Sequence, residues 1–314
     1  MEKINVYYSF GGSNKSFKMT MISIISLITN NKNNIINIYL LDCGAIPQYN
    51  IKKTSSEKIN EINNYIKNSG VDVTLHILNA NSLIKKYMLT GPNENWKNSR
   101  YTKISLLYIR YLIAFFKVPK KMLWLDSDTI ILNDLSELWK TNIDDYEWAG
   151  RKDMFDHSRG KDKPFLQNGV MLLNMPKVSH IFEQIIKNYK TQNYGEMGDM
   201  LILNNLLHSK KNLNKKFNSF KYTKKAYIWH MCCVALLPDK FFLLSIKVHF
   251  RWFLYRLGWY SDAIKQRNFN YNSKKIHNIW DCKIIKANEE SLIVKNFPQL
   301  IYIYDIYHIF FKDE

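Results

Sequence analysis

The sequence predicts an α/β fold in which a mostly parallel sheet is flanked by helices. Short apolar runs typical of buried strands alternate with helical patterns through the first half of the chain. Strands joined by such helical crossovers normally run parallel within one sheet. The 314 residues, with 46% hydrophobic content, are also enough to bury one large core, which excludes a disordered or fibrous protein.

The first elements follow one another in regular order. Residues 4–9 are predicted as a strand, and residues 17–29 as a helix that is apolar nearly all round and therefore buried. A second apolar strand is expected at 35–42. A capping-box pattern then begins a helix within 54–70, which ends at a glycine. Alternating apolar residues predict a third strand at 71–77.

The later elements are less regular. A long apolar helix is expected at 103–116, followed by a strand at 122–125. A further strand is expected at 169–173, with helices at 178–190 and 199–207. From residue 243 onward aromatic and basic residues interleave, which predicts a basic, aromatic, helical C-terminal region over 243–314 and a first domain over 1–242.

Charge and cysteine content limit the functional classes. The net charge is +18, from 45 Lys and Arg against 27 Asp and Glu. This charge suits nucleic acid, an anionic lipid surface or phosphorylated substrates, although a nucleotide-biased genome could also produce it. The four cysteines lack metal-site spacing, so we expect reduced thiols in a cytosolic protein. We expect neither a secretory signal nor a membrane-spanning helix.

Two carboxylates stand directly after the strand at 122–125. Asp126 and Asp128 share one face if the chain is still extended there, and such a pair can bind one divalent cation. Ligands in open parallel sheets bind beyond the carboxyl ends of the strands, where these residues lie. The plain alternative is a solvated turn after a strand.

Four segments together favour the first interpretation. They are SLLYIRYLIAFF (105–116), KMLWLDSDTIILNDLSELW (121–139), FLQNGVMLLNM (165–175) and GDMLILN (198–204). In this order they resemble the motifs of glycosyltransferase family 8, a retaining family that includes bacterial lipopolysaccharide galactosyl- and glucosyltransferases. The resemblance implies a GT-A fold, which is Rossmann-like.

The resemblance also implies the reaction. It would be the metal-dependent transfer of a hexose, with galactose or glucose favoured, from a UDP-sugar to a glycan or glycolipid, in bacterial surface polysaccharide or lipopolysaccharide synthesis. Mn²⁺ or Mg²⁺ would be the cofactor. The protein would be cytoplasmic, either free or peripheral on the inner face of the membrane, and no nucleic acid is expected as a partner.

Site residues carry over position by position. Asp126 and Asp128 would bind the metal with a late histidine, for which His277 is the candidate and His249 the rival. Gln167 and Asp199 would hold the reacting sugar. The remaining donor-binding positions implied by the resemblance are Ser9, Asn14, Arg110, Asp126, Asp153, Asn168, Gly169 and Lys283.

Some positions depart from the family pattern. Met200 stands where the family has a glutamine near the anomeric centre, and Leu201 replaces its second aspartate. The loop at 10–16 lacks the family's acidic residue. These departures leave open a degenerate fold that binds a sugar nucleotide without turnover. The net charge and the interleaved aromatic residues leave a nucleic-acid-binding protein as a weaker alternative.

The segment at 245–260 is predicted to dock on an anionic membrane. Its basic residues would meet lipid phosphates and its aromatic rings would suit the headgroup region. The alternative is a core helix whose aromatic side chains pack inward.

Overall fold

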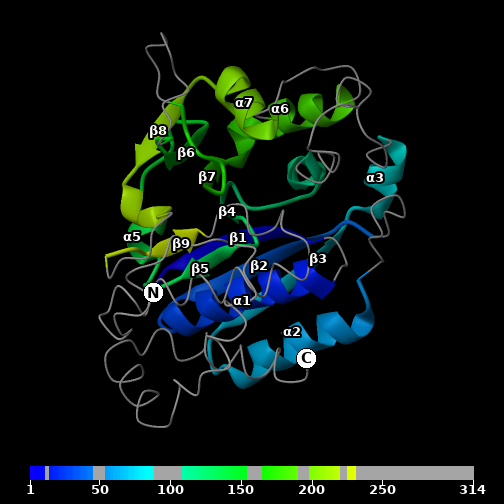
Figure 1. Cartoon of the computed structure of the whole chain (residues 1–314), viewed down its shortest axis with the longest axis vertical. Helices are drawn as coiled ribbons and strands as arrows, with labels where there is room; N and C mark the ends of the chain where they lie inside the picture. The colour runs from blue at the N-terminus through cyan, green and yellow to red at the C-terminus, as the bar shows by residue number, and fades with distance from the viewer. Residues whose placement is uncertain are drawn as a thin grey trace, which may run out of the picture. The chain divides into compact units, whose positions relative to one another are not determined.

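A computed structural model describes residues 1–10, 14–44, 54–87, 108–153, 165–189, 198–219 and 225–230 (Figure 1). All of them lie within Met1–Met231, one of the two units into which the chain divides. The expected boundary at residue 242, and the region 243–314 with its predicted membrane segment, lie outside the described residues.

A seven-stranded sheet forms the centre of the described fold. Six of its strands run in one direction, and only β7 runs antiparallel to its neighbours β4 and β6. This arrangement confirms the predicted mostly parallel sheet. In spatial order the strands are β3 (Val73–Asn79), β2 (Ile35–Asp42), β1 (Lys3–Phe10), β4 (Lys121–Leu125), β7 (Val170–Asn174), β6 (Trp148–Arg151) and β8 (Lys210–Leu213).

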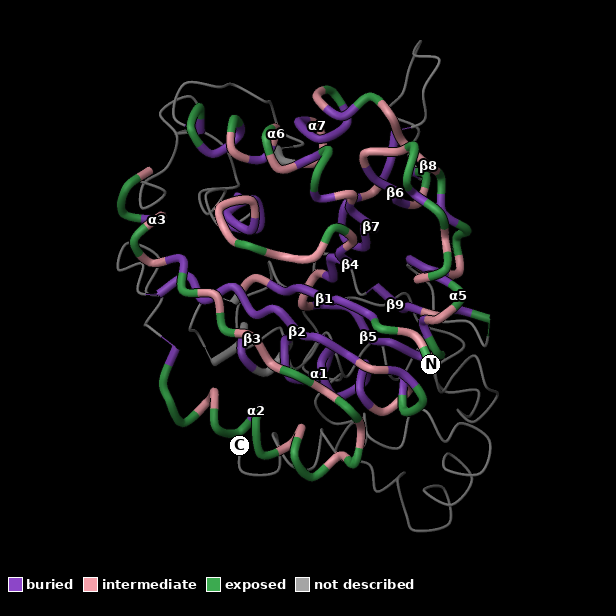
Figure 2. The backbone as a smooth tube through the Cα atoms, turned by 180° about the vertical axis from the view of Figure 1, so that it is seen from behind, coloured by how far each residue is buried: buried purple, intermediate pink, exposed green. Residues whose placement is uncertain are grey.

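Helices lie on both sides of the sheet, as Figures 1 and 2 show from opposite directions. On one side are α1 (Asn14–Asn30) and α2 (Ser56–Asn68). On the other are α3 (Asn81–Lys86), the 3-10 helix η3 (Ile109–Phe115), α6 (Met175–Lys187) and α7 (Gly198–Leu206). None of the described helices is both long and apolar enough to cross a membrane.

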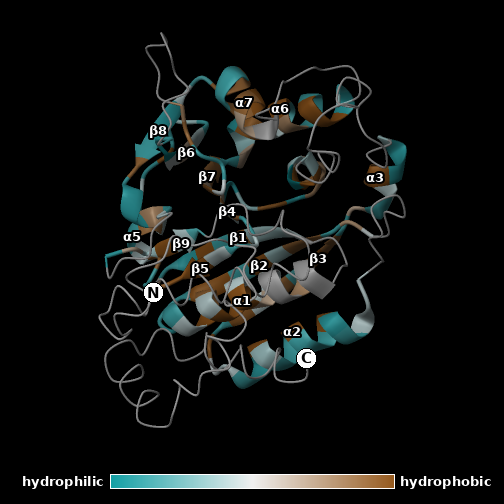
Figure 3. Cartoon of the chain, viewed as in Figure 1, coloured by the Kyte–Doolittle hydropathy of each residue, from teal (hydrophilic) through white to brown (hydrophobic). Residues whose placement is uncertain are grey.

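Burial of the strands explains why they appear in the sequence as continuous apolar runs. Seven consecutive residues of β2 are buried, so both faces of this strand are covered, as expected for a central parallel strand. The helix α2, in contrast, is mainly hydrophilic and exposed, and Ile62 is its buried residue (Figures 2 and 3). Its cap is Ser55, whose side chain accepts from Lys58 N, one residue after Thr54, at which the capping-box pattern begins.

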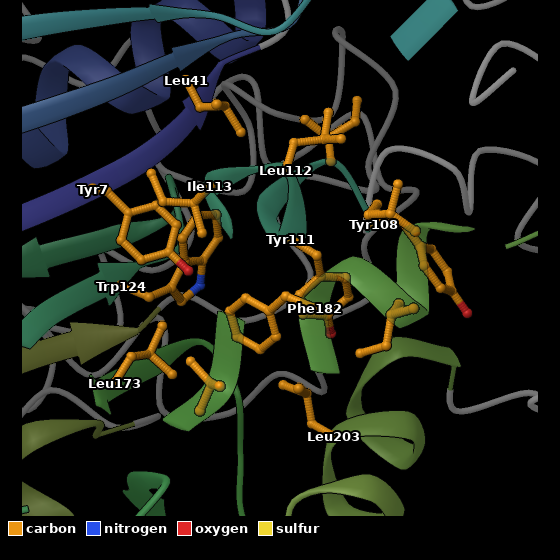
Figure 4. Packing of buried hydrophobic residues seen from close by; sticks show 14 of the residues in the cluster. Tyr7, Leu41, Tyr108, Tyr111, Leu112, Ile113, Trp124, Leu173, Phe182 and Leu203 are labelled. Atoms are coloured by element: carbon orange, nitrogen blue, oxygen red, sulfur yellow. The ribbon is translucent and has the colours of Figure 1, made fainter. Parts of the chain in front are cut away.

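The main core fills the space between the sheet and η3, α6 and α7. Tyr111 and Phe182 pack with ring centroids 4.9 Å apart, and Tyr7 and Trp124 with centroids 4.7 Å apart (Figure 4). The helix expected at 103–116 is described from residue 108 and is a 3-10 helix there. The strand at 122–125 is β4, in the interior of the sheet as predicted.

A small second sheet joins two distant parts of the chain. It pairs β5 (Thr129–Ile131) with β9 (Ile228–His230) in antiparallel register. The short helices α5 (Ser136–Trp139) and η4 (Lys215–Phe217) lie nearby in sequence. Because Thr129 is opposite His230, this sheet brings β9 to the turn that follows β4.

Candidate functional site

Hydrogen bonds hold the turn after β4 at both ends. Asp126 N donates to Gly169 O at 2.8 Å, which continues the pairing of β4 with β7 by one residue. Thr129 donates twice to Asp126 O, from its backbone N at 3.1 Å and from Oγ1 at 2.7 Å. A buried hydroxyl chain continues from Thr129 through Ser23 to Tyr8, with separations of 3.0 and 3.1 Å. The turn is therefore fixed to α1 and β1 as well.

A histidine completes the site. His230 Nε2 lies 3.2 Å from Asp128 Oδ1 and 3.7 Å from Asp126 Oδ2. One ligand atom from each of these three residues lies within 4.8 Å of the other two. His230 and Asp128 are buried, whereas Asp126 is partly exposed. Two carboxylates and one imidazole nitrogen fit a small divalent cation.

His230 was missed by reasoning from the sequence. We expected His277, with His249 as the rival, and both lie outside the described residues, as does Lys283. A signal was present, because His230 ends the apolar run AYIWH (226–230), just as Asp126 follows the apolar run of β4. Only the β5–β9 pairing shows that the two strand ends meet.

Asn218 fixes the orientation of the imidazole. Its Oδ1 lies 3.0 Å from His230 Nδ1, and Asn218 is completely buried. An amide oxygen only accepts hydrogen bonds, so this contact favours a proton on Nδ1, and Nε2 is the nitrogen that faces the carboxylates. The Asn218 carbonyl in turn accepts from Arg151 Nη1 at 2.6 Å. Such outer partners commonly set the tautomer of a metal-binding histidine.

Gly169 allows the side chains of the site to approach the backbone. A Cβ atom at this position would lie 2.1 Å from His230 Cε1 and 3.0 Å from Asp126 Oδ2. The first distance is shorter than carbon atoms tolerate, so a larger residue would have to displace the imidazole. The neighbours that require a glycine at this position are His230 and Asp126.

Arg110 lies beside the first aspartate. Its guanidinium is buried, donates to Asn168 O at 3.0 Å and lies 3.5 Å from Asp126 Oδ1. It also stacks on the Trp124 ring, with Cζ 4.7 Å from the ring centroid. The structure thus brings together Arg110, Asp126 and Asn168, as expected of residues that share one site.

Gln167 and Asp153 face each other across a backbone bridge. Gln167 Nε2 donates to Asp153 Oδ1, and the Gln167 backbone N donates to Arg151 O at 2.7 Å. Asn204 of α7 fixes the residue before Gln167: its amide accepts from Leu166 N and donates to Leu166 O, both at 2.8 Å. These two hydrogen bonds hold the segment that contains Gln167, Asn168 and Gly169.

The other expected residues are only partly described. Ser9 is partly exposed near the carboxyl end of β1. Asn14 begins α1 and Asp199 is the second residue of α7, but their side chains are outside the described part of the structure. Met200 is partly buried, and its carbonyl accepts from Asn204 Nδ2 at 2.9 Å.

Comparison with known proteins agrees with this geometry. The sequence profile described as glycosyl transferase family 8 matches residues 7–231, which include every part of the described site from Tyr7 to His230. The chain belongs to glycosyltransferase family 8. It is therefore a glycosyltransferase by family, and no curated protein sequence matches it.

Solved glycosyltransferases share the fold. An active-site mutant of LgtC is 17% identical, with a TM-score of 0.53, and the match covers 74% of this chain and 87% of that one. The galactosyltransferase LgtC in complex with donor and acceptor sugar analogues gives a TM-score of 0.52 with the same identity and coverage. Mouse xyloside xylosyltransferase 1 is 14% identical, with a TM-score of 0.51 over 74% of this chain and 98% of that one. These likenesses show that the chain has the GT-A fold.

Proposed function

We propose that the protein is a metal-dependent retaining glycosyltransferase that moves a hexose, with galactose or glucose favoured, from a UDP-sugar to a glycan or glycolipid. The observation that carries the proposal is the convergence of Asp126, Asp128 and His230 beyond the carboxyl end of β4. We infer that these three side chains hold Mn²⁺ or Mg²⁺, with His230 in the place for which the sequence suggested His277. Support comes from family membership and from the likeness to LgtC, a galactosyltransferase crystallised with donor and acceptor sugar analogues.

The side chains around the site suit a nucleotide diphosphate donor. A divalent cation, when bound, would neutralise the negative charge that grows on the departing diphosphate. Arg110 contributes a fixed positive charge 3.5 Å from Asp126, on the side of the site where Asn168 lies. Lys283 remains the proposed contact to the phosphates. Ser9 and Asn14 remain the proposed contacts to the nucleoside.

Polar groups next to the cation site suit the transferred sugar. Gln167, Asp153 and Asn168 offer amide and carboxylate groups that can bond to hydroxyls, which cannot be buried without partners. Asp199 is proposed to act with Gln167 on the reacting sugar. We favour front-face attack by the acceptor hydroxyl, with the leaving phosphate as base, so that catalysis rests on positioning and electrostatics.

One observation keeps a second candidate open. Met200 cannot donate or accept as the family's glutamine does, which favours a fold that binds sugar nucleotides without turnover. By contrast, the nucleic-acid-binding alternative does not explain the cluster of Asp126, Asp128 and His230.

We further propose a role in bacterial surface polysaccharide or lipopolysaccharide synthesis, at the cytoplasmic face of the membrane.

A donor-hydrolysis panel tests the proposal. The protein is incubated with Mn²⁺ and a set of sugar nucleotides, and release of the nucleotide diphosphate is measured with and without EDTA. We expect hydrolysis of UDP-galactose or UDP-glucose that EDTA abolishes. Donor binding without release would favour the degenerate fold, and equal activity in EDTA would refute metal dependence.

Variants of the cluster provide the matched comparison. Asp126→Ala, Asp128→Ala and His230→Ala should each abolish turnover. The melting temperature should change little in the two aspartate variants, because each removes one of two like charges that repel each other without a cation. It should fall in His230→Ala, which loses a buried ring and its contact with Asn218. Asp145→Ala is the control, since Asp145 is an exposed aspartate outside the cluster. Full activity of the His230 variant would exclude this histidine as a ligand.

A further inference from the structure

The two carboxylate oxygens of Asp126 face different partners. Oδ1 accepts from the Trp124 indole N–H at 2.9 Å and lies 3.5 Å from Arg110 Nη1. Oδ2 faces His230 Nε2 at 3.7 Å and lies on the side of Gly169. One oxygen is therefore held by the protein, and the other points to the cluster formed with Asp128 and His230.

Trp124 is well placed to hold Asp126. It lies in β4, two residues before Asp126, and side chains at this spacing project to the same side of a strand. The indole is 2% exposed, with the Tyr7 ring centroid at 4.7 Å and the Arg110 guanidinium carbon at 4.7 Å from its own ring (Figure 4 shows the two aromatic rings together). A ring packed in this way has little freedom to rotate, so its N–H has a fixed direction.

Arg110 supports the same contact from the other side. Its Nη1 donates to Asn168 O at 3.0 Å, which anchors the guanidinium to the segment between Leu166 and β7. From that anchor it faces Oδ1, the oxygen that the indole also binds. The indole hydrogen bond and the ion pair with Arg110 both involve Oδ1. They disfavour rotation of the carboxylate, because rotation would exchange Oδ1 for Oδ2 and break both contacts.

We propose that Trp124 is a positioning residue for the cation site: its indole N–H, with the Arg110 guanidinium, occupies Asp126 Oδ1 and presents Oδ2 alone to the cation. Asp126 is then a ligand through one oxygen, aimed before the cation arrives. This inference rests on the proposed metal dependence of the enzyme. Loss of the N–H should leave the carboxylate free to turn, and cation affinity should fall because the ligand is no longer oriented in advance.

The test compares two tryptophans. Trp148 of β6 is also completely buried, but its Nε1 makes no hydrogen bond among the described residues and it is outside the cluster. Trp124→Phe and Trp148→Phe thus remove the same atoms from equally buried sites, and only the first removes a bond to Asp126. Binding of Mn²⁺ is measured from the electron paramagnetic resonance signal of the free ion, and thermal unfolding is recorded for each variant.

The expected result is a loss of Mn²⁺ affinity on the order of 10–100-fold in Trp124→Phe, the usual effect of removing a partner of a metal ligand. Trp148→Phe should bind Mn²⁺ as the wild type does, although both variants lose some stability. If Trp124→Phe does not fold, site-specific replacement of Trp124 by 3-benzothienylalanine keeps the ring size and exchanges the N–H for sulfur.

The outcomes separate this proposal from the proposed function. If the wild-type protein binds Mn²⁺ and the Trp124 variants bind it with the same affinity, only the positioning role of Trp124 is overturned. Equal losses in the Trp124 and Trp148 variants also overturn it, because packing would then explain both. Wild-type protein that does not bind Mn²⁺ overturns the metal site itself, and the positioning role with it.

Discussion

Single residues set the directions in which the ligand atoms point. Asp126 is held through Oδ1 by Trp124, and His230 is held through Nδ1 by Asn218, so the atoms that face each other are Oδ2 and Nε2. Each of these two proposed ligands has one polar atom bound to the protein and another facing the cluster. This division makes the neighbours of the ligands good targets for substitution.

Substitution of Asn218 should weaken Mn²⁺ binding, although Asn218 is not itself a proposed ligand. Asn218→Leu removes the acceptor for His230 Nδ1, so we expect Mn²⁺ affinity to fall roughly 10–100-fold. Asn218→Asp keeps an acceptor at this position and should retain most of the affinity. Titration of both variants with Mn²⁺ measures the difference, and equal affinities would show that Asn218 does not orient the imidazole.

Substitution of Gly169 should disrupt the cluster by contact. In Gly169→Ala the new Cβ would lie 2.1 Å from His230 Cε1, so the imidazole must move. We expect loss of Mn²⁺ binding together with destabilisation of about 1–3 kcal/mol, the usual range for overpacking. Gly70→Ala is the control: no atom lies within 4 Å of its Cβ, but its φ of +67° should cost about 1–2 kcal/mol. Mn²⁺ binding should survive in the control and be lost in the Gly169 variant.

At the level of elements, the site depends on how strands and helices are joined. β5 and β9 bring His230 to the turn after β4, and α7 holds the segment at 165–169 through Asn204. Both links join distant parts of the chain. β5 and β9 pair Thr129 with His230, and Asn204 and Leu166 are 38 residues apart. A change in these links should therefore alter the site from a distance.

The link from α7 can be tested by denaturation. Asn204→Leu leaves the Leu166 backbone N–H and carbonyl without their amide partner in a buried place, and each such group costs about 1–3 kcal/mol. We expect a lower urea midpoint and a lower turnover. Asn205→Leu, at an exposed position of the same helix, should change the midpoint little. Similar midpoints in both variants would argue against the anchoring role of Asn204.

The basic and aromatic segment at 245–260 makes a separate prediction. Its cations and aromatic rings should bind anionic vesicles reversibly, with about 1 kcal/mol from each basic residue near the surface. We expect co-sedimentation with anionic but not with neutral liposomes, weakened by salt and by Arg251→Glu combined with Arg256→Glu. Wild-type protein that stays in the supernatant with anionic liposomes at low salt would contradict the prediction.

For the whole molecule, the sheet order explains where the site lies. β1 and β4 are adjacent and parallel, so their carboxyl ends are at the same edge, and the antiparallel β7 begins where β4 ends. Gly169, just before β7, thereby meets Asp126, just after β4. The net charge of +18 suits the phosphates of a donor or of a membrane surface, and the local contacts of the site are what favour the first of these.

The sequence alone determined the fold class and part of the site. Strand and helix periods are local, so the mostly parallel sheet, the position of β4 inside it and the capped start of α2 could be predicted. Asp126 and Asp128 follow one apolar strand at a spacing of two residues, and the resemblance of four segments to family 8 made them the candidate metal ligands.

Tertiary structure decided which residues join them. His230 is 104 residues beyond Asp126, and the apolar run that it ends does not by itself say that it meets that turn. The choice depends on the β5–β9 register, which places His230 opposite Thr129. The roles of Trp124 and Asn218 depend likewise on the directions of buried side chains, which packing fixes and which the order of residues along the chain does not express.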